Sequence, residues 1–183
     1  YLIIGASSGI GKELAQKLHG DGHHVYATYN ENQAGSVNER FQYHKLNVLD
    51  DDINIDFLPD NLDGLAYCPG NINLRPFARL KPESFTEDFK LQVLGAIKVI
   101  QAALPRLKSR DGGSIVMFST VAVQTGFNFH SQVSTSKGAI EGLTRALAAE
   151  FAPGVRVNCI APSLTNTRLA SKLLNTEDKI EAN

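Results

Sequence analysis

The 183-residue sequence contains few of the residues that would indicate an oxidised compartment or a metal site. It has no Trp, one Met and two Cys. Cys68 and Cys159 stand far apart, with no CxxC pair and no His at ligand spacing. This arrangement argues against both a disulfide framework and a zinc site. We therefore expect a reducing, cytoplasmic setting and no metal.

Long apolar runs and blocks of one charge are missing as well. No uninterrupted apolar stretch approaches the roughly 20 residues of a membrane-spanning helix. The formal net charge is −1, and the basic residues are spread along the chain, so the attraction that nucleic-acid binding requires is absent. We expect neither a membrane nor a nucleic-acid partner. The composition, 43% hydrophobic and 20% charged, is typical of a soluble globular protein, and the length fits one domain over residues 1–183.

Short apolar runs alternate with stretches of helical period along the whole chain, which predicts a parallel sheet with crossover helices. The fold class is therefore α/β. We expect strands at residues 1–4, 25–29, 43–46, 65–68, 114–119 and 155–160. We expect helices at residues 9–19, 85–107 and 133–151, with Pro105 bending or ending the second of them.

A glycine-rich loop, Gly-Ala-Ser-Ser-Gly-Ile-Gly at residues 5–11, follows the first expected strand and opens the first expected helix. Glycines let the backbone turn tightly and approach a pyrophosphate without Cβ atoms in the way. The helix N-terminus then offers free N–H groups to the phosphates. Glycine spacing alone is weak evidence, but its position between strand and helix favours a dinucleotide site.

This loop resembles the glycine signature of the short-chain dehydrogenase/reductase family. Four further landmarks resemble that family in the same order, so the resemblance runs from Leu2 to about Leu169. They are Asn47-Val48, Cys68-Pro69-Gly70, Ser136-Lys137 with Gly138-Ala139, and Val157 to Pro162.

The resemblance implies a Rossmann-like, doubly wound parallel sheet in a three-layer α/β/α domain that binds NAD or NADP. It also implies an oxidoreductase that acts on a small alcohol or carbonyl. The cofactor-binding positions that it implies are Gly5, Ser7, Ser8, Gly9, Ile10, Gly11, Tyr29, Asn30, Asn47, Val48, Cys68, Pro69, Gly70, Lys137, Pro162 and Thr167.

The choice between NADP and NAD rests on the end of the second expected strand. A carboxylate there would bind the 2′-hydroxyl of NAD and repel the 2′-phosphate of NADP. Tyr29 and Asn30 carry no charge, which favours NADP slightly. However, Ser8 stands where relatives that prefer NADP often carry a basic residue, and nearby Glu31 could reverse the preference.

The catalytic residues that the family resemblance implies are only partly present. The family uses a tyrosine to donate a proton, a lysine one helical turn later and a serine that polarises the carbonyl. Lys137 matches the lysine, but the tyrosine position is Val133, which has no proton to donate. Thr120 keeps the hydroxyl of the serine position. Gln92 keeps the amide of the family's helical asparagine.

Several alternatives remain open from the sequence. His130 could replace the missing acid, although a histidine in a loop is usually solvated. Lys137 could instead be a solvated helix charge, and Cys68 is expected to be a small hydrophobe rather than a nucleophile. The chain could be a weak or inactive dinucleotide binder used for sensing or assembly. It could also be a domain of this fold that binds no dinucleotide.

Two expectations concern the whole protein. Family members continue past the Pro-x-x-x-x-Thr segment into a substrate-covering lobe and a final edge strand, so we expect this chain to be incomplete at both ends and to lack that C-terminal strand. The resemblance also implies a homodimer or homotetramer, formed by the second and third expected helices. The substrate is not predictable from the sequence.

Overall fold

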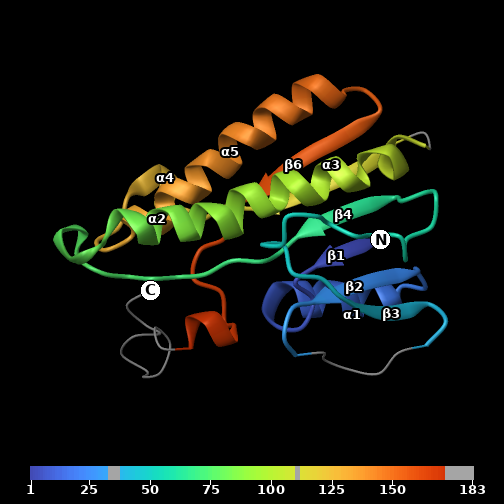
Figure 1. Cartoon of the computed structure of the whole chain (residues 1–183), viewed down its shortest axis with the longest axis horizontal. Coiled ribbons are helices and arrows are strands. Elements are labelled where there is room, and N and C mark those ends of the chain that lie inside the picture. Colours follow the sequence, from blue (N-terminus) through green and yellow to red (C-terminus); the bar gives the residue numbers. More distant parts are fainter. Residues whose placement is uncertain (33–37, 110–111, 172–183) are drawn as a thin grey trace.

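A six-stranded sheet with purely parallel neighbours forms the centre of the molecule (Figure 1). The structure is a computed structural model that describes residues 1–32, 38–109 and 112–171. The strand order is β3-β2-β1-β4-β5-β6, the classic order of a doubly wound fold. The Rossmann-like class predicted from the sequence is therefore confirmed. The strands are β1 (Leu2–Ile4), β2 (Val25–Tyr29), β3 (Phe41–Lys45), β4 (Gly64–Tyr67), β5 (Gly113–Phe118) and β6 (Val155–Ile160).

The helices follow the predicted positions, with three differences. The first, α1 (Gly9–Gly20), lies as expected, whereas the helix predicted at 85–107 consists of α2 (Pro82–Phe89), the π-helical segment η2 (Lys90–Leu94) and α3 (Gly95–Lys108). Pro105 does not end α3, which continues to Lys108. The third helix, α5 (Ser131–Phe151), begins two residues earlier than predicted. Short helices are η1 (Phe77–Arg79), α4 (Ala122–Thr125) and η3 (Arg168–Ala170).

Alternating side chains divide the sheet into two apolar faces. Leu2 and Ile4 of β1 belong to a large core with residues of α3 and α5, whereas Ile3 between them belongs to a smaller core with α1. This alternation is the period of two of a β-strand. Helices therefore cover both faces of the sheet, and the three-layer arrangement predicted from the sequence is confirmed (Figure 1).

The π-helical turn η2 changes the register of the long helix just where it passes the end of β4. One backbone carbonyl, that of Leu91, accepts a hydrogen bond of 2.6 Å from the buried Tyr67 hydroxyl. Burial raises the pKa of this phenol well above its usual value, so the hydroxyl stays a donor. Turns of this kind are frequent at functional sites, and here the turn carries Gln92.

The fold gives limited information on the expectations about partners and chain ends. Within the three described ranges, none of the helices has the length and apolar character needed to cross a bilayer. β6 and β3 are the two edge strands of the described sheet. The expected C-terminal strand would follow residue 171 and lies outside the described residues.

Candidate functional site

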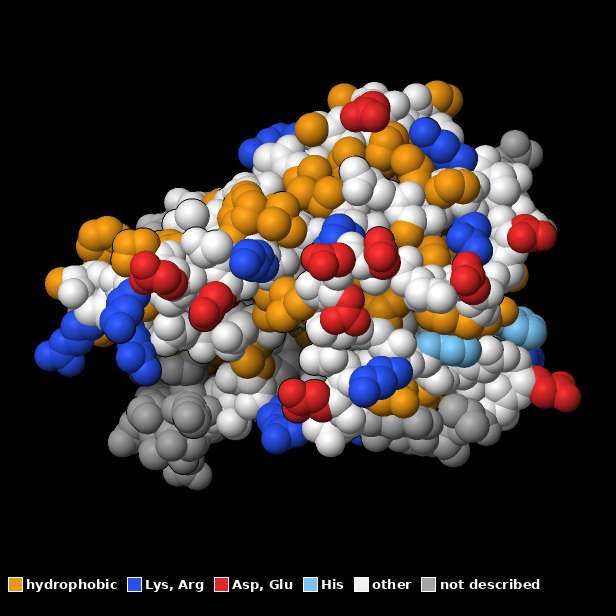
Figure 2. All heavy atoms as spheres, in the orientation of Figure 1, with side chains coloured by type: hydrophobic (Ala, Val, Ile, Leu, Met, Phe, Trp, Pro, Cys, Tyr) orange, Lys and Arg blue, Asp and Glu red, His pale blue; other side chains and the backbone are white. Residues whose placement is uncertain are grey.

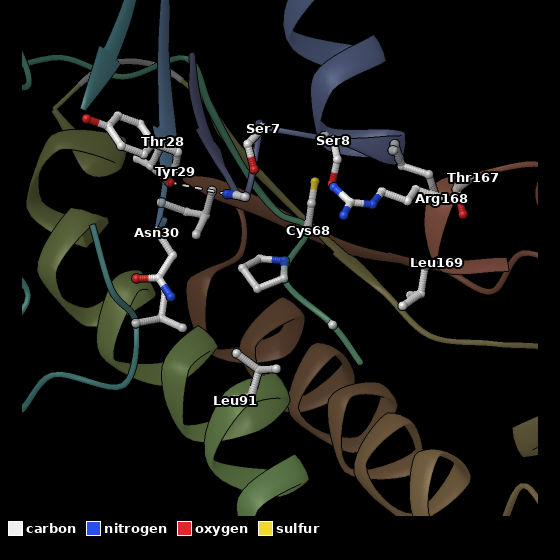
Figure 3. A pocket seen from close by; sticks show the side chains of 18 of the residues that line it. Ser7, Ser8, Thr28, Tyr29, Asn30, Cys68, Leu91, Thr167, Arg168 and Leu169 are labelled. Atoms are coloured by element: carbon white, nitrogen blue, oxygen red, sulfur yellow. Dashed lines mark hydrogen bonds between the residues drawn. The ribbon is translucent and has the colours of Figure 1, made fainter. Parts of the chain in front are cut away.

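A cleft of about 640 Å³ opens at the carboxyl edge of the sheet (Figure 3). In the order observed here, the chain leaves β1 and β4 toward opposite sides, and ligands of doubly wound folds bind in the resulting crevice. Every predicted cofactor residue lines this cleft except Lys137 and Pro162. The cleft is lined by Gly5, Ser7, Ser8, Gly9, Ile10, Gly11, Tyr29, Asn30, Asn47, Val48, Cys68, Pro69, Gly70 and Thr167.

The glycines of the loop after β1 are required by the geometry. Gly5 has a φ of +76° and Gly9 a φ of +55°, which side chains rarely permit. A Cβ on Gly11 would lie 2.5 Å from the Gly5 carbonyl oxygen, closer than such atoms come. The Gly5 N–H is satisfied by the buried Thr28 hydroxyl at 3.2 Å. The loop is therefore a fixed backbone surface against which phosphates could lie, at the N-terminus of α1.

The other side of the cleft is formed by the ends of β2 and β3. Tyr29 packs its ring edge to face against Tyr43, with centroids 6.4 Å apart. The Asn47 side chain serves its own turn, because its amide nitrogen donates to Asp50 at 2.7 Å and its oxygen accepts from the Leu49 N–H at 3.1 Å. Glu31, which could have reversed the cofactor preference, is exposed and is not among the described residues that line the cleft.

The loop after β4 passes under the glycine loop. Pro69 lies 3.1 Å from the Cβ position of Gly5, so the two loops are in close contact. Burial raises the pKa of the Cys68 thiol to about 12, although the charge of Lys137 opposes that effect. A thiol with such a pKa is protonated at neutral pH, which agrees with the interpretation of Cys68 as a small hydrophobe.

The sequence analysis missed Arg168, which follows the predicted contact Thr167. Among the described residues that line the cleft, Arg168 is the only one with a charged side chain. Figure 3 shows its guanidinium group beside Ser8 of the glycine loop. Ser8 offers no charge of its own, and the cation comes instead from the distant end of the chain. Arg168 could have been predicted only by knowing which loops lie close together in space, because it is distant from Ser8 in the sequence.

The predicted catalytic residues lie beside the cleft, around the ends of β5 and β6. Thr120 follows β5, and its hydroxyl accepts a hydrogen bond of 3.3 Å from the Ala122 N–H. Pro162 follows β6, and its carbonyl accepts from the Val121 N–H at 3.3 Å. Val133, which the resemblance places at the tyrosine position, is 5% exposed, so its isopropyl group is packed inside the protein.

Lys137 lies one turn after Val133, with its amine beside Gly70. Its Nζ is 3.7 Å from the Cβ position of Gly70. Burial lowers the pKa of Lys137 to about 8, while the carboxylate of Asp88 and the two cysteine thiols oppose that change. Lys137 is therefore held within the protein and is not a freely solvated helix charge.

Gln92 lies against the carboxylate of Asp88, a residue that was not predicted from the sequence to belong to the site. Its Nε2 donates to both carboxylate oxygens of Asp88 at 2.8 Å. Both residues are buried, and the Gln92 Oε1 lies 3.4 Å from the Cβ position of Gly70. The Gln92 oxygen and the Lys137 amine thus both lie beside the loop after β4.

His130 occupies a different environment. It precedes α5, its Nδ1 lies 2.8 Å from the Asn128 carbonyl oxygen, and its ring packs against Phe127. It does not line the cleft described above. Within the described part of the chain, no three His, Cys, Asp or Glu side chains form a group that could hold a metal ion.

Comparison with known proteins identifies the family. The family model described as short chain dehydrogenase matches residues 1–178. The chain therefore belongs to the short-chain dehydrogenase family, and the recognition made from its motifs is confirmed.

Relatives of known name share about three residues in ten with the chain. It is 29% identical over 188 residues to mouse dehydrogenase/reductase SDR family member 4, covering 94% of this chain and 67% of the mouse protein. It is 31% identical over 195 residues to the 1,2-dihydroxy-1,2-dihydronaphthalene dehydrogenase of Pseudomonas putida, covering 97% of this chain and 74% of that enzyme.

Solved structures agree with this assignment. A short-chain dehydrogenase of Shigella flexneri, crystallised with NADP, superposes with a TM-score of 0.85 and 26% identity over 98% of this chain and 83% of that one. A similar protein of Escherichia coli, crystallised with NADPH, gives a TM-score of 0.84 and 26% identity. The match covers 98% of this chain and 82% of that one.

Proposed function

We propose that the chain is an NAD(P)-dependent oxidoreductase that interconverts a small alcohol and a carbonyl compound by an altered proton path. The observation that carries the proposal is the continuous cleft at the switch point between β1 and β4, which brings almost all predicted cofactor residues together. The glycine loop fits a dinucleotide, because side-chain-free backbone lies where phosphates would approach. When bound, the reduced nicotinamide supplies the hydride.

The residues of the chain have distinct roles in this proposal. The Thr120 hydroxyl holds and polarises the substrate oxygen, and Lys137 holds the ribose of the cofactor. The Gln92 Oε1, which lies beside Gly70 and has no hydrogen-bond partner in the part of the chain that the structure describes, is the acceptor proposed for the Lys137 amine. Val133 supplies no proton, so the usual general acid is absent, and its loss costs about 10² to 10⁴ in rate without removing hydride transfer.

We propose NADP as the preferred cofactor. The end of β2 presents Tyr29 and Asn30 to the cleft and no carboxylate that would repel a 2′-phosphate. The Shigella and Escherichia relatives crystallised with NADP and NADPH support a nicotinamide dinucleotide of this kind.

We further propose a homodimer or homotetramer that works in the cytoplasm on a small molecule. Both cysteines are free thiols. Figure 2 shows hydrophobic side chains over α3 and α5, and Phe89 and Leu94 of the long helix are 36% and 42% exposed. Packing of these helices against a second copy would cover that surface. Sedimentation velocity of the full chain checks the assembly, and a monomer at micromolar concentration would contradict it.

The experiment that tests the function is a fluorescence titration with NADPH and NADH, followed by a screen of carbonyl substrates. The wild type is compared with Val133→Tyr and with Val133→Phe, which adds the same ring without the hydroxyl. We expect binding in all three, slow turnover in the wild type and faster turnover with tyrosine but not with phenylalanine.

Two results would contradict the proposal. Absence of NADPH and NADH binding by the wild type would exclude a dinucleotide enzyme. Cofactor binding by all variants, with turnover only in Val133→Tyr, would indicate the second candidate function, that of an inactive dinucleotide-binding protein. The observation that favours this candidate is the packed isopropyl group of Val133.

A further inference from the structure

A buried carboxylate lies under the loop that follows β4. Asp88 is on the last turn of α2 and is 5% exposed, whereas its neighbour Glu87 is exposed. A carboxylate loses its hydration in such a position and is stable there only with hydrogen bonds and an opposite charge. One donor is known, because Gln92 Nε2 lies 2.8 Å from each carboxylate oxygen.

The other end of Gln92 is aimed at the same loop. Its Oε1 is buried and has no hydrogen-bond partner among the described residues. This oxygen is 3.4 Å from the Cβ position of Gly70, and the Lys137 Nζ is 3.7 Å from that point. The Gln92 oxygen and the Lys137 amine therefore both approach Gly70, which lines the switch-point cleft. Because the Gln92 nitrogen donates to Asp88, the amide oxygen is the end that lies beside Gly70.

The charges around Lys137 single out Asp88 as its counter-charge. The other ionisable groups that act on the amine are the thiols of Cys159 and Cys68. Glu141 lies one turn further along α5, but its carboxylate accepts a hydrogen bond of 2.7 Å from Ser119 and pairs with Arg145 at 3.8 Å. Asp88 is thus the carboxylate that acts on Lys137.

We propose, on the basis of the function proposed above, that Lys137 exchanges the proton with the substrate oxygen in this chain. In the same proposal Asp88, acting through Gln92, is the positioning residue that holds the Lys137 amine. Val133 cannot donate a proton, and the His130 ring lies in the loop before α5 against Phe127. The Lys137 amine is one helical turn from Val133 and lies beside Gly70, which lines the cleft. A pKa of about 8, lowered by burial against the opposing charge of Asp88, suits exchange near neutral pH.

The proton transfer balances without a further reactant. In reduction, the carbonyl carbon takes the hydride from the nicotinamide, and the C=O electron pair moves to the oxygen. That oxygen takes a proton from the Lys137 ammonium, so an alcohol and a neutral amine result and the cofactor is oxidised. The amine then regains a proton from water. Oxidation of the alcohol is the reverse, with the neutral amine as the base.

The proposal fixes the direction of the pH dependence. The protonated amine is required for reduction, so the rate falls as pH rises through the pKa of Lys137, and oxidation rises over the same range. Burial lowers the pKa of Lys137, and the negative charge of Asp88 raises it, so Asp88→Asn removes the charge that opposes the lowering. The pKa of Lys137 should therefore fall by about one pH unit, and the limb of the reduction profile should move with it.

The first test measures this pKa directly by NMR titration of full-length protein with ¹⁵N-labelled lysine, with the Lys137 signal assigned from Lys137→Arg. Asp88→Asn is compared with Glu87→Gln, which removes the same charge from the adjacent, exposed position. Thermal unfolding checks that both variants are folded. We expect a shift of about one pH unit in Asp88→Asn and none in Glu87→Gln. An unchanged Lys137 pKa in folded Asp88→Asn would overturn the role of Asp88.

The second test separates binding from proton transfer. Lys137→Arg keeps a cation that cannot lose its proton at neutral pH. We expect NADPH affinity within about fivefold of the wild type, with the reduction rate lowered at least 100-fold, as loss of a general acid would give. Reduction by Lys137→Arg at near the wild-type rate would overturn the role of Lys137. Absence of cofactor binding by the wild type would instead overturn the proposed function, and the pKa shift would still report on Asp88.

Discussion

The two halves of the carboxyl edge of the sheet differ in how closely they follow the family pattern. Around β1 and β4, the glycines of the family's loop signature are present, and they line one cleft together with the residues that follow β3 and β4. Around β5, η2 and the start of α5, the resemblance predicts threonine, valine and glutamine at the three positions where the family has serine, tyrosine and asparagine. Cofactor binding and chemistry are therefore separable in this chain, and substitutions can test each half alone.

The largest effect is expected at Thr120, in the chemical half. Thr120→Val removes the hydroxyl but keeps the shape, so the rate of carbonyl reduction should fall about 100-fold, as for loss of a donor to a developing oxyanion. Steady-state kinetics and NADPH titration measure the two halves separately. Thr120→Ser should stay active, and Thr125→Val removes a hydroxyl from exposed α4 as a control. A change in NADPH affinity with an unchanged rate would contradict the assignment.

The converse test is Gly11→Ala, which should damage binding in the other half. The added methyl would meet the Gly5 carbonyl oxygen at 2.5 Å and displace the loop. Such crowding costs about 2 kcal/mol, or roughly 30-fold in NADPH affinity. Gly20→Ala is the matched control, because a Cβ there meets nothing within 4 Å. If equilibrium titration gave equal affinities for both variants, the loop would not be the phosphate-binding surface.

A smaller effect is expected at the end of β2, where the cofactor preference is tested. Tyr29→Asp places a carboxylate where a 2′-phosphate would lie, so NADPH affinity should fall about tenfold relative to NADH. Tyr29→Asn loses the same ring without gaining charge and should leave the ratio unchanged. Parallel titrations with the two cofactors measure the ratio. A tenfold fall with asparagine as well would mean that the tyrosine ring, and not charge, sets the preference.

The smallest effect concerns Arg168, which lies beside Ser8 of the glycine loop. Arg168→Gln should weaken NADPH and NADH equally, by about fivefold, because an exposed charged contact contributes about 1 kcal/mol. Equal loss indicates contact with the pyrophosphate that both cofactors share. Lys17→Gln removes an exposed cation that pairs with Asp21 at 3.6 Å and should have no effect. Loss of NADPH affinity alone would place Arg168 at the 2′-phosphate instead.

The sequence was sufficient to predict the features that depend on neighbouring residues. Glycine spacing after a strand predicted the Gly5 to Gly11 loop, and the alternation of strands and helices predicted the sheet. In parallel strands the carboxyl ends meet at one edge, so landmarks after β1, β3 and β4 had to converge.

Other features depend on contacts that no local pattern encodes. From the sequence alone, Asp88 would be interpreted as a solvated helix charge. Its burial depends on the packing of α2 against elements that are distant in sequence. Arg168 reaches Ser8 only because the loop after β6 returns to the glycine loop. The π-helical turn at Lys90–Leu94 has no signature in its own amino-acid composition. The hydrogen bond to the Leu91 carbonyl in this turn comes from the Tyr67 hydroxyl of β4, which is distant in sequence.

The position of β1 in the middle of the sheet has a consequence for synthesis of the protein. β1 pairs with β2 on one side, but its other neighbour is β4, in the register Leu2 to Leu65. A ribosome that adds roughly 5 to 20 residues each second needs on the order of 3 to 12 seconds to deliver that partner. During this time the first strand has an open, apolar edge. The pairing of β1 with β4 therefore has to wait for a distant segment, and we expect the nascent chain to be vulnerable to aggregation until that segment is available.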